Sequence, residues 1–125
     1  EETHLQRITA LLAKEQYTRL LPLWRFMGWL TGALPALLGA NTVFATIDAV
    51  ETFVDQHYQE QLNRIDPNGR FADIRLTLAE CQADEIAHGD EARGLATPVR
   101  GPLLSLWALV VKSGSAAAVW AARRI

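Results

Sequence analysis

Two Glu-x-x-His pairs and one isolated glutamate are the residues of this sequence best suited to binding metal. The pairs are Glu1/His4 and Glu85/His88, and the isolated acid is Glu51. Residues at positions i and i+3 lie on one helix face, so a glutamate and a histidine with this spacing can reach one metal ion. Imidazole and carboxylate ligands with open coordination positions suit iron that activates oxygen. A mononuclear zinc site is the alternative, but it needs only three protein ligands and a water.

The apolar residues around Glu85 and Glu51 predict that both acids lie on inward helix faces. Steps of four and three connect Glu85 and His88 with Ile74, Leu78, Cys81, Ala92 and Leu95. The same steps connect Glu51 with Phe44, Ile47, Val54, Tyr58, Leu62 and Ile65. The first pair precedes Ile8 and Leu11 in the same way, so all five candidate ligands are expected to point inward. A buried acid without a partner is costly, and a metal ion is a partner that these side chains could share.

A strong turn signal, Asp-Pro-Asn-Gly at residues 66–69, separates Glu51 from Glu85. The two acids are equally far from Asn68 along the chain. Two antiparallel helices rise at the same rate, so the acids should meet at one level, roughly 20 Å or more from the turn. The hairpin alone therefore predicts that Glu51 faces the Glu85/His88 pair.

The elements that must position these residues are all helical, and nothing alternates with the period of a strand. Helices are expected over residues 1–17, 20–40, 42–65, 70–95 and 103–125. Di-iron bundles take one Glu from each of two helices and a Glu-x-x-His from each of the other two. The sequence therefore predicts one all-α, ferritin-like domain over residues 1–125, whose remaining helix and sixth ligand would precede Glu1.

Two of the expected helices are strongly apolar. Residues 20–40 approach the length of a membrane span, but they contain Arg25 and two prolines that should break the regularity of the helix. The last helix carries Lys112. Such helices suit either the interface plane of a membrane or the core of a soluble protein, and the residues alone leave both open.

Composition excludes several classes of protein. Half of the 125 residues are apolar and the formal net charge is −2, which argues against disorder and against an electrostatic nucleic-acid binder. Cys81 is the single cysteine, so the chain has neither a disulfide framework nor a cysteine-rich zinc site.

At these residues the sequence resembles the demethoxyubiquinone hydroxylase (Coq7) family of the ferritin-like superfamily, over nearly the whole chain. The resemblance rests on Glu1-x-x-His4-Leu5, Pro22-Leu23-Trp24, Gly28, Gly32, Ala36-Leu37-Leu38-Gly39, Val50-Glu51, His57-Tyr58-x-x-Gln61 and Asp84-Glu85-x-x-His88-x-Asp90. The sequence departs from the family pattern at Thr52 and Gln56, neither of which is a ligand position.

The resemblance implies a di-iron monooxygenase of ubiquinone biosynthesis. Such an enzyme hydroxylates the ring of a demethoxyubiquinol-type polyprenyl quinol with O2 and an external reductant, for which NADH is a candidate. It implies peripheral binding to a membrane surface, on the cytoplasmic face of a bacterial inner membrane or the matrix face of the mitochondrial one. A lipid-binding protein of ubiquinone biosynthesis is a candidate partner.

The resemblance also implies roles for individual residues. Glu51, Glu85 and Tyr58 would be catalytic, with Tyr58 bonding a ligand or gating oxygen chemistry. A plain core aromatic is the equal alternative for Tyr58. The ligands of two Fe ions would be Glu1, His4, Glu51, Glu85 and His88.

Two further expectations concern the surroundings of the site and the competing functions. Asp84 or Asp90 should orient His88 through its second ring nitrogen, as metal-bound histidines require. His57 lies off the apolar row. The alternatives to a hydroxylase are a ferritin-like protein that binds or oxidises iron, and a non-catalytic membrane-associated subunit.

Overall fold

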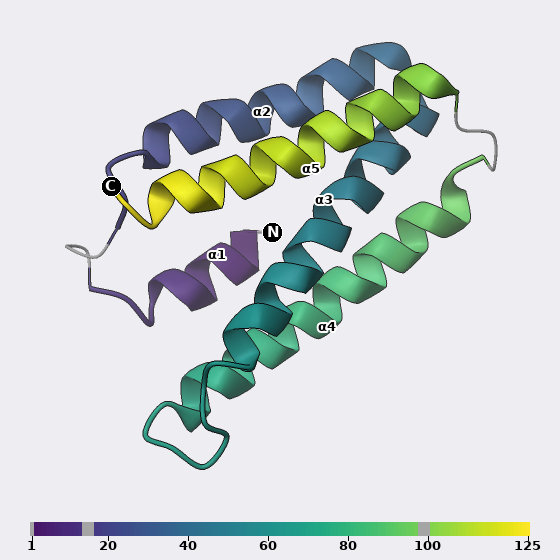
Figure 1. The fold of residues 1–125 in the computed structure, drawn as a ribbon. Helices are drawn as coiled ribbons and strands as arrows, with labels where there is room; N and C mark the ends of the chain where they lie inside the picture. Colours follow the sequence, from purple (N-terminus) through teal and green to yellow (C-terminus); the bar gives the residue numbers. More distant parts are fainter. Residues whose placement is uncertain (1, 14–16, 98–100) are drawn as a thin grey trace.

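The computed structural model describes residues 2–13, 17–97 and 101–125, and within these ranges every regular element is a helix. The helices are α1 (Glu2–Thr9), α2 (Leu21–Leu38), α3 (Ala40–Leu62), α4 (Ala72–Leu95) and α5 (Pro102–Ala122). Figure 1 shows α2 and α5 crossing one end of the long α3–α4 hairpin, with α1 beside the hairpin. The all-α prediction is confirmed, and the helix boundaries move by a few residues.

The α3–α4 hairpin contains the core of the molecule. The turn signal forms as predicted: the Asn68 amide donates to Asp66 Oδ1 at 2.9 Å, and the Gly69 amide donates to the Asp66 carbonyl at 3.1 Å. Tyr58 and Leu62 from α3 pack against two buried residues of α4. Those α4 residues are Leu78 and the fully buried Cys81, and Ile8, Val54, Ile65, Ile74 and Ala79 pack around the cluster.

Helix α1 packs against α4 and is shorter than predicted. It ends at Thr9. The backbone then continues in a tighter turn, in which the Leu11 amide donates to the Ile8 carbonyl and the Leu12 amide to the Thr9 carbonyl, three residues back instead of four. The Tyr17 hydroxyl donates to the Thr9 carbonyl at 3.1 Å, so the chain returns to the end of α1. An ion pair from Arg7 to Glu80 joins α1 to α4.

Helix α2 runs without interruption through the prolines that were expected to break it. Pro22 lies in the first turn, where its missing N–H has no partner to lose. Pro35 lies inside the helix and is buried. The helix ends at Leu38, and the φ of 104° at the following Gly39 allows the sharp reversal into α3.

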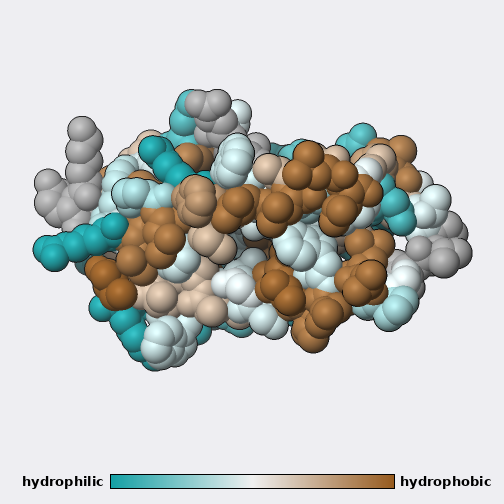
Figure 2. Space-filling model, turned by 90° about the horizontal axis from the view of Figure 1, so that it is seen from above, coloured by the Kyte–Doolittle hydropathy of each residue, from teal (hydrophilic) through white to brown (hydrophobic). Residues whose placement is uncertain are grey.

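Helices α2 and α5 both pack on α3 and leave much of their apolar surface exposed. Trp107 on α5 donates from Nε1 to the Thr46 hydroxyl on α3 at 2.7 Å. Figure 2 looks down on the α2 and α5 side and shows apolar side chains gathered in rows along it. The exposed side chains include Trp29, Leu37, Leu103, Leu106 and Leu109. By length and composition, α5 is the one helix of the described residues that could cross a membrane.

Candidate metal centre

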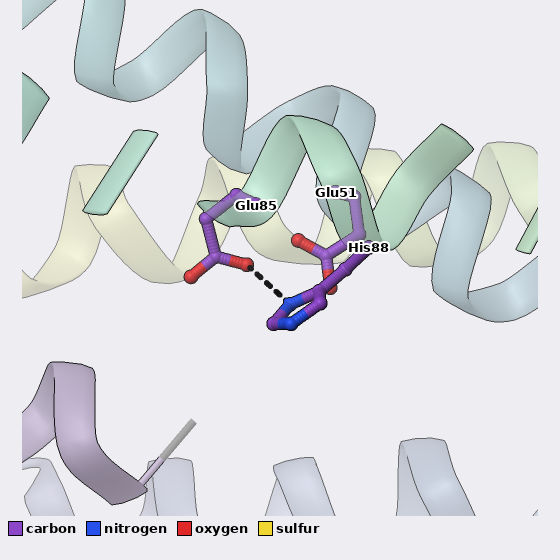
Figure 3. A group of neighbouring side chains, drawn as sticks. All are labelled: Glu51, Glu85 and His88. Atoms are coloured by element: carbon purple, nitrogen blue, oxygen red, sulfur yellow. Dashed lines mark ion pairs between the residues drawn. The ribbon is translucent and has the colours of Figure 1, made fainter. Parts of the chain in front are cut away.

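The hairpin brings Glu51 on α3 together with Glu85 and His88 on α4. One potential ligand atom from each of the three side chains lies within 4.8 Å of the other two. Figure 3 shows the two carboxylates and the imidazole turned toward one another, with an ion pair of 3.9 Å between Glu85 Oε2 and His88 Nδ1. The meeting of Glu51 with the second Glu-x-x-His pair is as the equal distances from Asn68 predict.

The three side chains differ in burial, which the sequence did not predict. Glu51 and Glu85 are buried, but the His88 side chain is 47% exposed. His88 therefore joins the two acids as predicted, but it is not buried with them as its place in the apolar row suggested. The buried row of α4 steps from Glu85 to Gly89 and then to Ala92, so a histidine three residues after Glu85 lies at the edge of that row. His88 closes the group from its solvent side.

His4 on α1 contacts the same group from a third helix. It is buried, its Nδ1 lies 2.8 Å from Glu85 Oε1, and its Nε2 lies 3.0 Å from Asp84 Oδ2. The His4 and His88 rings are 6.3 Å apart, centroid to centroid. The fold thus collects four of the five predicted ligands, whereas Glu1 lies outside the described residues.

The carboxylates next to the ligands have different partners from those predicted. Asp84 contacts His4, and Asp90 pairs with Arg93. Neither contact involves His88, so the expectation that one of them orients His88 is wrong. Asp84 on α4 contacts a histidine of another helix, because α1 places the His4 ring beside both Asp84 and Glu85. A carboxylate on one nitrogen of a histidine is the arrangement that fixes its ring in metal sites.

Burial and hydrogen bonding act in opposite directions on the charges of this group. Burial raises the pKa of Glu85, but hydrogen bonds with Glu51 and His4 outweigh it and leave this pKa below its usual value. The hydrogen bond with Asp84 raises the pKa of His4 against the effect of burial, and the bond with Glu85 adds to the rise. Both shifts favour the charged forms, a carboxylate at Glu85 and an imidazolium at His4.

Tyr58 and His57, neighbours in the sequence, lie on different sides of α3. Tyr58 is buried in the core cluster with Leu62 and Cys81, on the face that also carries Glu51. Its catalytic role stays a prediction. His57 stacks on Phe53, with ring centroids 6.1 Å apart, and faces a groove of about 630 Å³ between α3 and α5.

Three residues beside the group were missed by the sequence analysis: Gly89, Arg93 and Asp48. Gly89 is buried where α4 passes closest to Glu51. Arg93 pairs with Asp48 of α3 at 2.7 Å and with Asp90 of its own helix. A glycine four residues after Glu85, on the buried row of a helix, was the available signal for a close helix contact.

The chain matches the family model of the ubiquinone biosynthesis protein COQ7 over residues 1–122. It belongs to the Coq7 family. The family explains the arrangement found here, in which acids and histidines of separate helices converge inside a helical bundle.

Similar Coq7-family proteins carry hydroxylase names. The chain is 30% identical to a 3-demethoxyubiquinol 3-hydroxylase of Rhodospirillum rubrum, with all of this chain and 58% of the relative aligned. It is 28% identical to the NADPH-dependent 3-demethoxyubiquinone 3-hydroxylase of Dictyostelium discoideum mitochondria, with 100% of the chain and 58% of the relative covered. The mouse mitochondrial protein of the same name is 26% identical, with 99% and 58% covered. The chain thus spans less than two thirds of the length of these relatives. No solved structure matches the chain.

Proposed function

We propose that the protein is a di-iron monooxygenase that hydroxylates the ring of a demethoxyubiquinol-type polyprenyl quinol in ubiquinone biosynthesis. The observation that carries the proposal is the convergence of Glu51, Glu85, His88 and His4 from three helices. The hydroxylase names of the matched relatives support the choice of reaction and substrate.

The donor set suits two iron ions. Buried carboxylates this close repel each other unless a proton or a cation lies between them. Carboxylate and imidazole ligands together suit iron. Glu85 contacts a histidine through each of its carboxylate oxygens, His4 through Oε1 and His88 through Oε2. In the proposed site Glu1, His4, Glu51, Glu85 and His88 would hold the two ions. When bound, the iron pair supplies the activation of O2.

Other side chains of the proposed site hold or shield the ligands. Asp84 accepts from Nε2 of His4 and keeps Nδ1 of that ring turned toward Glu85. We propose that the apolar cluster around Tyr58, which lies on the same buried helix faces as Glu51 and Glu85, keeps water from one side of the two acids. Tyr58 itself is proposed to bond a ligand or to gate access of oxygen.

The exposed apolar surface of α2 and α5 suits a polyprenyl substrate that resides in a lipid bilayer. Trp29 is 65% exposed on α2, and Leu103 is 82% exposed on α5. We propose that this surface binds peripherally, at the cytoplasmic face of a bacterial inner membrane or the matrix face of a mitochondrial one. A nicotinamide nucleotide as electron donor and a lipid-binding protein of ubiquinone biosynthesis as partner complete the proposal.

Iron content and hydroxylation test the proposed function together. The full-length protein should contain about two irons per chain, and Glu85→Ala should abolish hydroxylation of a demethoxyubiquinol while the helix content is kept. Glu91→Ala is the matched control, because Glu91 is exposed on the same helix. Zinc alone, or no metal, contradicts the di-iron site. Iron uptake without quinol hydroxylation indicates a ferritin-like iron-oxidising protein instead.

A further inference from the structure

Helices α3 and α4 lie close together at Gly89, beside the Glu51, Glu85 and His88 group. A Cβ atom at this position would lie 3.2 Å from the Glu51 Cβ and 3.3 Å from Arg93 Nη1. Carbon atoms in ordinary contact are about 3.5–4.0 Å apart. The Glu51 Cβ is attached directly to the backbone of α3, so it can move away only if the helix or its local backbone moves. A side chain at position 89 would therefore require α3 and α4 to separate by a few tenths of an ångström beside Glu51.

Arg93 holds the two helices together one turn from this contact. Its Nη1 donates to Asp48 Oδ1 of α3 at 2.7 Å, and its Nη2 donates to Asp90 of α4. Asp48 is buried and lies one turn before Glu51. The planar guanidinium reaches both carboxylates at once, which a single-point cation such as lysine does not reproduce. The contact fixes both the separation and the register of α3 against α4 next to Glu51.

We propose that Gly89 and Arg93 are positioning residues that set the distance between the Glu51 and Glu85 carboxylates, and thereby the affinity of the site for metal. The inference rests on the proposed function, because it needs Glu51 and Glu85 to be ligands. It assigns Gly89 a reason for standing in the middle of a helix, where glycine weakens the helix. Neither residue is among the proposed ligands.

The test compares Gly89→Ala with Gly94→Ala in the full-length protein. Both replace a glycine of α4, but a Cβ at position 94 meets nothing within 4 Å. Metal-depleted protein is titrated with Co²⁺, and the affinity and the visible absorption spectrum are recorded with the thermal unfolding midpoint. We expect Gly89→Ala to weaken Co²⁺ binding about tenfold or more and to change the spectrum. Gly94→Ala should keep the wild-type affinity and spectrum.

Arg93→Gln separates positioning from simple electrostatics. Removing a positive charge near a cation site should tighten Co²⁺ binding if charge alone matters. Positioning predicts weaker binding, because the contact between Arg93 and Asp48 is lost. The Arg93 side chain is partly exposed, so this variant removes no core volume and keeps the test available if Gly89→Ala fails to fold.

The outcomes are distinct. Weaker binding in both Gly89→Ala and Arg93→Gln, with a changed spectrum and a normal Gly94→Ala control, supports the inference. Wild-type binding in Gly89→Ala, or tighter binding in Arg93→Gln, overturns it and leaves the metal site intact. Absence of Co²⁺ binding by the wild-type protein overturns the proposed function, and the positioning role falls with it.

Discussion

The α3–α4 hairpin and the α2–α5 surface depart from the usual distribution of side chains in opposite directions. The hairpin buries acids, among them Asp48, Glu51 and Glu85. Helices α2 and α5 instead expose large apolar side chains such as Leu37 and Leu103. Buried charge needs partners within hydrogen-bond reach, and exposed apolar area gains from being covered. The hairpin is therefore suited to small ions, whereas the α2–α5 surface is suited to something large and apolar.

The largest expected effect on stability comes from a substitution in the core of the α3–α4 hairpin. Leu78→Ala should lower the free energy of unfolding by about 2–5 kcal/mol, because it leaves a cavity beside Tyr58 and Leu62. Leu76→Ala is the control: Leu76 lies on the same helix but is 61% exposed. Denaturant unfolding of the full-length variants measures the difference. Equal losses from the two variants would mean that the hairpin is not the core.

Substitutions on the α2–α5 surface should change membrane binding and leave stability nearly unchanged. Replacing Leu103, Leu106 and Leu109 together by serine should leave the unfolding midpoint in solution nearly unchanged, because all three are exposed. Binding to phospholipid vesicles should fall about tenfold or more, since each leucine contributes roughly 1.5–3 kcal/mol when it leaves water. Flotation of the full-length protein with vesicles measures this, with Leu76→Ser as the control. Unchanged flotation would contradict membrane binding through this surface.

The smallest expected effect concerns His57, which lies where the two regions meet. Burial, followed by the charge of Arg123, lowers the pKa of His57 below 6.5. The folded protein therefore resists protonating it, and stability from this residue is complete above pH 6.5 and falls as the pH drops toward the folded pKa.

The pH dependence of the stability contributed by His4 has the opposite sign. Its pKa is raised, so this contribution is lost as the pH rises. The comparison to make is thus between the wild-type protein and His57→Gln. Unfolding midpoints measured from pH 7.5 down to about 5 should fall more steeply for the wild type. A variant with an unchanged pH profile would exclude His57 as the source.

The sequence predicted the hairpin well, because its signals are local. The turn at Asp66 to Gly69 and the apolar rows of the two helices were enough to place Glu51 opposite Glu85. The contacts that were missed join separate helices. The bond from His4 to Asp84 depends on how α1 docks, and the exposure of His88 depends on which side of α4 is covered. No periodicity within one helix contains that information.

The symmetry of the α3–α4 turn also bears on how this gene can change over evolution. Residues 66–68 are exposed, so a codon inserted there lengthens a surface loop and leaves both helices in place. A codon inserted within α4, between Ala72 and Glu85, is different, because it rotates every later side chain of the helix by about 100° and carries Glu85 out of reach of Glu51. Length variation among descendants of this chain should therefore accumulate at the hairpin tip, while the stretches on either side keep their residue count even as their identities drift.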